Sequence, residues 1–152
     1  TVLLQKKCIS FKLNNIHLRP VKIIKYTSRI RYFNYLLITN EHLFLIQQRC
    51  NLDIWKKLYE LPLIETNKKI NKATLMNQTQ LKEFEVINIK KNYEEEHNLS
   101  HQKLKITFWH ITVKNLNTNS YTKKIKQDNI NKYPFPKPLA KYLKIQYTNE
   151  KK

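Results

Sequence analysis

The chain has 152 residues and no glycine, and its 29 lysines and arginines outnumber its 11 aspartates and glutamates, which gives a formal net charge of +18. At average usage, roughly ten glycines would be expected in a chain of this length. Their absence excludes the glycine-rich phosphate loop, the dinucleotide-binding fingerprint and the nucleophile elbow, because each needs a residue without Cβ. The usual nucleotide- and acyl-handling enzymes are therefore excluded by composition.

The positive charge favours a polyanionic partner, and nucleic acid is the first candidate because such a field attracts it and speeds association. Part of the charge reflects codon usage, since lysine, asparagine and isoleucine are abundant while arginine occurs four times. No apolar run approaches the roughly 20 residues of a membrane-spanning helix, and Cys8 and Cys50 make no disulfide framework. We therefore expect one intracellular, monomeric domain with no membrane partner.

The first half of the chain predicts an irregular segment followed by a hairpin. Residues 1–28 are basic and show no clear periodicity. Residues 31–38 and 42–49 are rich in aromatic and branched side chains, and the polar residues 39–41 between them supply a turn, so the two runs are predicted to pair. Residues 53–62 are aromatic, but they are not periodic enough for a long helix.

The middle of the chain predicts one helix and three strands. The helix is expected over residues 71–82, with one side formed by Leu75, Met76 and Thr79. The strands are expected over residues 84–93, 103–110 and 121–126. The clearest alternation places one set of side chains toward a core, namely Leu104, Ile106 and Phe108.

A last helix is predicted to begin near Pro136 and Pro138, because proline is favoured in a first helical turn. Its apolar stripe is formed by Leu139, Tyr142, Leu143 and Ile145. Strands that surround one or two helices indicate the α+β class. No internal repeat is visible.

The most suggestive local feature is Leu99-Ser100-His101, which lies between an acidic stretch and the strongest strand. A serine hydroxyl both donates and accepts hydrogen bonds, so Ser100 could test the edge of a base in either sense. The alternative is an ordinary polar loop, and the three residues by themselves favour that alternative because short motifs often match by chance.

Other polar and aromatic groups favour structural roles. Successive side chains of an extended segment alternate between faces, so the run Glu94-Glu95-Glu96 is expected to be solvated and not to converge on a metal. His17, His42 and His110 have no partner at metal-ligand spacing, and no metal site is expected. The aromatic residues that could stack on bases, but are more often part of a core, are Phe33, Trp55 and Tyr59.

Residues 80–84 (Gln-Leu-Lys-Glu-Phe) are faintly similar to a Q-L-x-x-F clamp-binding peptide. Because they join a predicted helix to a predicted strand inside the domain, a structural role is favoured for them.

Taken in order, several segments resemble the C-terminal domain of A/G-specific adenine DNA glycosylases of the MutY type. Residues 54–62 (Ile-Trp-Lys-Lys-Leu-Tyr-Glu-Leu-Pro) are similar to the family's G-L-W-x-x-L-Y-x-F-P, and Leu99-Ser100-His101 is similar to its F-S-H loop. The other matching segments are residues 18–22, 31–35 and 45–49, and a terminal proline-rich helix. The resemblance covers roughly residues 1–147.

The resemblance implies a Nudix-like α+β fold, a mixed β-sheet flanked by helices, over residues 29–148. Residues 1–28 would be a linker from the end of a catalytic domain that this chain lacks, and residues 149–152 a basic tail. The family's hydrolase chemistry would be absent, because the residues after Pro62 lack the glycines and the R-E-x-x-E-E run that holds a metal. The protein would be bacterial and cytoplasmic, and associated with the nucleoid through DNA.

For function, the resemblance implies recognition of 8-oxoguanine in duplex DNA, opposite the adenine that the catalytic domain flips out and removes in base excision repair. By motif match, Ser100 would contact the 8-oxoguanine edge while Leu99 and His101 shape a wedge. Guanine N7 accepts a hydrogen bond, whereas N7 of 8-oxoguanine carries a hydrogen and O8 accepts. Leu99 stands where the family has phenylalanine, so stacking would become aliphatic packing.

The partners implied are duplex DNA with an 8-oxoguanine:adenine mispair and the chain's own catalytic domain. The parent protein would be a DNA N-glycosylase, and this chain would carry no catalytic residue. The alternatives left open are a Nudix-type hydrolase of oxidised nucleotides and a nonspecific nucleic-acid-binding module.

The family also carries a 4Fe–4S cluster whose last ligands read C-P-L-x-x-x-C. Cys8 fits the final ligand, but Val2 stands where another cysteine belongs. Because such a cluster normally needs four thiolates, this chain alone is expected to hold no cofactor, and the parent's cluster stays open.

Overall fold

The computed structural model describes residues 28–50 and 52–148. Val2, Cys8 and the predicted basic tail lie outside the described residues, as does nearly all of the predicted linker. The elements, in chain order, are β1 (Arg29–Asn40), β2 (Leu43–Gln48), β3 (Tyr59–Glu60), β4 (Leu63–Thr66), α3 (Lys72–Met76), η2 (Thr79–Leu81), β5 (Val86–Asn98), β6 (Gln102–Val113), β7 (Thr122–Lys126), η3 (Gln127–Lys132) and α4 (Lys137–Thr148).

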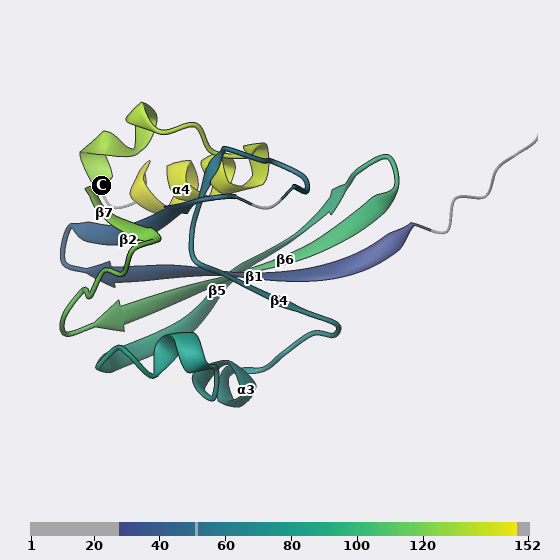
Figure 1. Ribbon diagram of the computed structural model, residues 1–152. Helices are drawn as coiled ribbons and strands as arrows, with labels where there is room; N and C mark the ends of the chain where they lie inside the picture. The colour runs from purple at the N-terminus through teal and green to yellow at the C-terminus, as the bar shows by residue number, and fades with distance from the viewer. Residues whose placement is uncertain (1–27, 51, 149–152) are drawn as a thin grey trace, which may run out of the picture.

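One seven-stranded sheet forms the centre of the molecule, with strand order β3-β2-β1-β6-β5, while β4 pairs with β1 and β7 pairs with β2. The long central strands β1 and β6 are parallel, and the remaining pairs are antiparallel. Helix α4 covers one face of the sheet, and α3 lies against the other face (Figure 1). The mixed sheet flanked by helices confirms the predicted α+β class.

The face under α4 carries the first hydrophobic core. Every second side chain of β1 and β6 enters it, and the predicted inward set of Leu104, Ile106 and Phe108 is confirmed, with exposures of 0%, 1% and 0%. Tyr142 of α4 stacks on Phe108 with 4.0 Å between ring centroids. Leu139 and Leu143 complete the buried side of α4, whereas Ile145 is 44% exposed, so the predicted apolar stripe ends before it.

The opposite face carries a second core that the alternation in residues 103–110 did not predict. Trp109 is 2% exposed there, and its Nε1–H donates to Oδ1 of Asn34 at 3.2 Å. Leu36 and Ile38 of β1 join it from the neighbouring strand, and Leu75 of α3 covers it. Both central strands are therefore buried on two faces, as strands of a parallel pair commonly are.

The predicted helix over residues 71–82 is wrong in its length. Asn71 caps α3, because its Oδ1 accepts from the backbone N–H of Thr74 at 2.8 Å. The helix ends at Met76, with Asn77 as its C-cap, since Gln78 has extended backbone angles, and a short 3-10 turn follows. Leu75 is buried, but Met76 is 50% exposed and does not share its face. A helix of one turn is stable only through such a buried contact.

Among the described residues, three have left-handed backbone conformations, namely Glu41, Trp55 and Lys57, with φ of 51°, 59° and 67°. This conformation costs residues with a Cβ roughly 1–2 kcal/mol each. Glu41 turns the predicted hairpin between β1 and β2, which is confirmed, but the two strands pair only beside the turn, at Thr39–Phe44 and Asn40–Leu43, and not along residues 31–38. Trp55 and Lys57 lie in the loop between β2 and β3, so this loop keeps backbone strain that glycine would relieve.

Candidate nucleic-acid interface

The three residues singled out from sequence form the turn between β5 and β6. The backbone N–H of Leu99 donates to the carbonyl of Gln102 at 2.8 Å, which closes the turn with Ser100 and His101 at its apex. Both apex residues are exposed, whereas Leu99 is half-buried and packs against the first core. The end of this hairpin projects from the body of the sheet, beside the start of β1 (Figure 1). We call residues 99–101 the hairpin tip.

Strand β5 is longer than predicted, since it runs to Asn98 and includes the acidic run. Its glutamates nevertheless diverge as expected. Glu94 pairs with Lys69 and Lys91, and Glu96 pairs with Lys103 and Lys105. Glu95 points to the α4 side, where it pairs with Lys141, and its side chain is only 17% exposed, so the predicted solvation of the run is wrong at this residue. Within residues 28–50 and 52–148, no group of three or more His, Cys, Asp or Glu side chains is arranged to hold a metal ion.

The loop between β2 and β3 packs beside the hairpin formed by β5 and β6. The Trp55 ring meets Phe33 edge-on, with 6.4 Å between centroids, and lies 5.8 Å from the ring of His97. His97 is two residues before the tip. Trp55 is half-buried and Phe33 is fully buried, so these aromatic residues pack in the domain as predicted. The contact places the loop next to the candidate base-reading residues.

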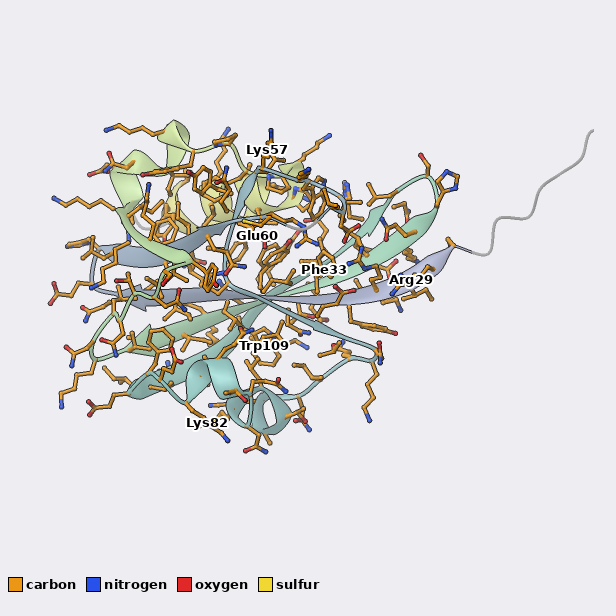
Figure 2. The ribbon with its side chains drawn as sticks, viewed as in Figure 1. Arg29, Phe33, Lys57, Glu60, Lys82 and Trp109 are labelled. Carbon is orange, nitrogen blue, oxygen red and sulfur yellow. The ribbon has the colours of Figure 1, made fainter. Side chains whose placement is uncertain are left out.

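A buried ion pair anchors the same loop from inside. Nη1 of Arg49 lies 3.0 Å from Oε2 of Glu60, and the two side chains are 3% and 4% exposed. Glu60 also accepts from Nε2 of Gln47 at 3.1 Å and from the hydroxyl of Tyr35 at 3.2 Å. Burial, together with the negative charge of Glu60, raises the pKa of Tyr35. In Figure 2, Glu60 and Phe33 lie on the α4 side of β1, and Trp109 lies on the other side.

A second guanidinium extends this cluster toward the hairpin tip. Arg31 binds both oxygens of Glu65, at 2.6 and 2.8 Å, and its Nη2 lies 2.7 Å from Oδ2 of Asp53. Asp53 also pairs with Arg49 at 3.1 Å. The remaining Nη1 of Arg31 donates to Oε1 of Gln102 at 3.1 Å, directly after the tip. One connected set of charges therefore ties the loop to the hairpin.

We call Arg31, Arg49, Asp53, Glu60 and Glu65 the charged cluster. The sequence did not predict it, because its members lie far apart in the chain. Arg31 and Arg49 also both approach the Phe33 ring, with their Cζ atoms 4.8 and 5.4 Å from its centroid. One signal was available: arginine is rare in this lysine-rich chain, and two of the four arginines lie in the predicted hairpin. Only the planar guanidinium can bind a carboxylate with two parallel hydrogen bonds and stack on a ring.

These ion pairs, which involve Asp53 in the loop between β2 and β3, predict that the free energy of unfolding falls in acid. The hydrogen bond from Arg31 lowers the pKa of Asp53 from 3.8 to about 2, so Asp53 contributes stability above about pH 4 that is lost as the pH falls toward about 2. We expect Asp53→Asn to flatten the dependence of the free energy of unfolding on pH in this window, measured by urea titration. Asp128→Asn, at an exposed site on η3, is the control. Parallel curves for the native chain and Asp53→Asn would contradict the prediction.

The similarity of residues 80–84 to a clamp-binding peptide is not supported by their packing. Leu81 is 3% exposed in the second core, and Phe84 packs against the same core. A peptide that docks on a partner must present these apolar side chains, and here the domain itself buries them.

The family model described as the NUDIX domain matches residues 34–145. The chain belongs to this family. No curated protein matches it. Among solved structures, the C-terminal domain of mouse MUTYH, in a complex with human PCNA, superimposes on this NUDIX domain with a TM-score of 0.61 at 13% identity, covering 79% of this chain and 89% of that one.

Two further structures show the same fold. A NUDIX hydrolase from Nitrosomonas europaea gives a TM-score of 0.58 at 8% identity, covering 82% of this chain and 92% of that one. The NUDIX domain of Shewanella oneidensis NrtR, complexed with ADP ribose, gives a TM-score of 0.56 at 10% identity, covering 91% of this chain and 97% of that one.

Among the helices of the described residues, none has the length and the apolar character that a membrane span requires.

Proposed function

We propose that this NUDIX domain is a recognition module without hydrolase activity, which binds duplex DNA and recognises 8-oxoguanine opposite adenine. The observation that carries the proposal is the exposed Ser100 at the apex of a projecting hairpin. The tip combines a serine hydroxyl with backbone polar groups and with a half-buried leucine that supports them. Its similarity to the F-S-H loop, together with the fold shared with the MUTYH C-terminal domain, supports the same function.

The chemistry of the lesion suits such a tip. In 8-oxoguanine, N7 carries a hydrogen and O8 accepts, which reverses the acceptor that guanine presents at N7. The Ser100 hydroxyl can accept from N7–H, and a backbone N–H can donate to O8. Unmodified guanine offers no such pair. In this proposal adenine is removed by a separate catalytic domain, because a base must leave the stack before its glycosidic bond can be cut.

The residues after Pro62 weigh against the hydrolase alternative. Magnesium-assisted cleavage of a pyrophosphate needs carboxylates that hold the metal. Residues 72–81, which form α3 and η2, contain no aspartate or glutamate. The one carboxylate of β4, Glu65, accepts hydrogen bonds on both of its oxygens from Nε and Nη2 of Arg31. Membership of the family alone is compatible with a hydrolase. The lack of carboxylates available to hold a metal in residues 63–81 favours a recognition module instead.

The test is the preference for an 8-oxoguanine:A duplex over a G:A duplex, measured as a ratio of dissociation constants for the full 152-residue chain. We expect Ser100→Ala to reduce this ratio roughly ten-fold, because a good pair of hydrogen bonds to a base contributes about 1–3 kcal/mol of discrimination. Ser120→Ala, an exposed serine between β6 and β7, should leave the ratio unchanged. An unaltered ratio in Ser100→Ala would remove the assignment.

Hydrolysis is tested in parallel. If the native chain turned over an oxidised nucleoside triphosphate in the presence of magnesium, the proposal of a recognition module would fail and the hydrolase assignment would replace it.

A further inference from the structure

Most lysines of β5 and β6, the strands of the projecting hairpin, already form ion pairs. Lys103 lies 2.6 Å and Lys105 3.8 Å from Glu96, and Lys91 lies 2.9 Å from Glu94. The acidic run therefore offsets only part of the positive charge along both strands, since Glu94 and Glu96 are each shared between two lysines. A high total charge does not by itself make this hairpin an attractive surface for a polyanion, so the phosphates must be met by other cations near the tip.

One cation beside the tip and two in the loop that contacts the hairpin form no ion pair with a described residue. Arg29, Lys56 and Lys57 are exposed, and among the described residues none of their charged groups has an ion-pair partner within 4.0 Å. Arg29 lies directly beside the apex, because its backbone N–H donates to the carbonyl of His101 at 3.3 Å. We call these three residues the basic rim.

Lys56 and Lys57 lie in the loop between β2 and β3, which contacts the same hairpin. Trp55, the residue before them, contacts His97 near the end of β5. Figure 2 shows Arg29 at the start of β1 and Lys57 at the outer bend of the loop, so the rim spans two separate elements. The rim therefore combines cations that come from different parts of the chain.

The loop that carries the lysines is held in one shape. The backbone N–H of Lys57 donates to the carbonyl of Arg49 at 2.9 Å, and the carbonyl of Lys57 accepts from Nε2 of Gln48 at 3.0 Å. Asp53 is tied to two arginines. These contacts maintain the left-handed backbone of Trp55 and Lys57, and such retained strain is typical of loops that bind ligands.

We propose that the basic rim binds the phosphates of duplex DNA while the hairpin tip inspects a base. Phosphate contacts fix the register of a protein on the duplex, whereas base contacts carry specificity. The rim and the tip therefore have separable roles. This inference rests on the proposed function in that DNA is the partner, but it concerns the backbone and not the lesion.

The test is the salt dependence of binding to both duplexes by the full chain. Each phosphate contact contributes about 0.9 to the slope of log K against log salt concentration. The double variant Lys56→Gln/Lys57→Gln should therefore lose about 1.8 from the slope, and Arg29→Gln about 0.9. The affinities for the 8-oxoguanine:A and G:A duplexes should fall by the same factor, so their ratio stays unchanged.

The matched control is Lys124→Gln/Lys126→Gln on β7, which also removes two exposed lysines and lies at the opposite end of the sheet from the hairpin tip (Figure 1). Its slope should equal that of the native chain. An equal loss in the control, or no loss in the rim variants, would overturn the proposal. The Ser100→Ala ratio is a separate readout: lesion recognition can fail while the rim effect persists, and the rim can fail while lesion recognition persists.

Discussion

Replacing Glu60 by leucine is expected to lower the free energy of unfolding by about 3–5 kcal/mol, because removing one partner of a buried ion pair leaves the other charge without compensation. The guanidinium of Arg49, 3% exposed, would lose the carboxylate that lies 3.0 Å away. Gln47 and Tyr35 would lose their acceptor in the same change. Urea-induced unfolding, followed by tryptophan fluorescence and circular dichroism, measures the effect.

A double-mutant cycle separates the free energy of the ion pair from the cost of leaving one charge buried without a partner. Arg49→Met alone should also destabilise the domain strongly, since Glu60 then stays buried without its ion-pair partner. Combining it with Glu60→Leu should restore part of the loss, because no unpaired charge remains and apolar side chains can fill the site. Strictly additive effects of the two substitutions would contradict a coupled buried pair.

The second large effect is expected for Phe108→Ala, with a loss of about 3–5 kcal/mol in the free energy of unfolding. Phe108 is fully buried, its ring stacks on Tyr142 at 4.0 Å, and it lies 5.8 Å from Tyr35. Alanine would leave a cavity between the sheet and α4, and it would remove the contact that docks the helix. The same urea titration measures the effect.

Ile87→Ala is the matched control in the neighbouring strand β5, where the side chain is 67% exposed. An exposed substitution of this kind usually changes stability by no more than about 0.5 kcal/mol. A loss at Ile87 comparable to that at Phe108 would show that strand propensity, and not core packing, controls the stability of this sheet.

The charged cluster connects stability to the candidate interface. Arg31 reaches Gln102 at the base of the hairpin tip, and its other nitrogens hold Asp53 and Glu65. Stability and interface geometry therefore depend on the same arginine, and a variant that breaks the cluster is expected to affect both. Exposed substitutions at the tip and the rim avoid this coupling, which is why the functional tests rely on them.

Local patterns predicted much of this architecture. The alternation in β6, the branched and aromatic runs of the first hairpin, and the apolar spacing of Leu139, Tyr142 and Leu143 each depend on neighbours within a few residues. They suffice to assign α+β and the inward set of one strand face. The motif at Leu99-Ser100-His101 likewise needed no tertiary information, and the structure adds that it is the apex of a hairpin.

Only the tertiary structure determines which distant segments of the chain are in contact. Strand β1 pairs in parallel with β6, and the bond from Arg31 to Gln102 spans 71 residues of sequence. No local periodicity encodes such a pairing, because the free energy that selects it comes from burying both faces of the central strands at once. For the same reason the one-turn α3, the second face around Trp109 and the ion pairs around Asp53 became visible only in the folded chain.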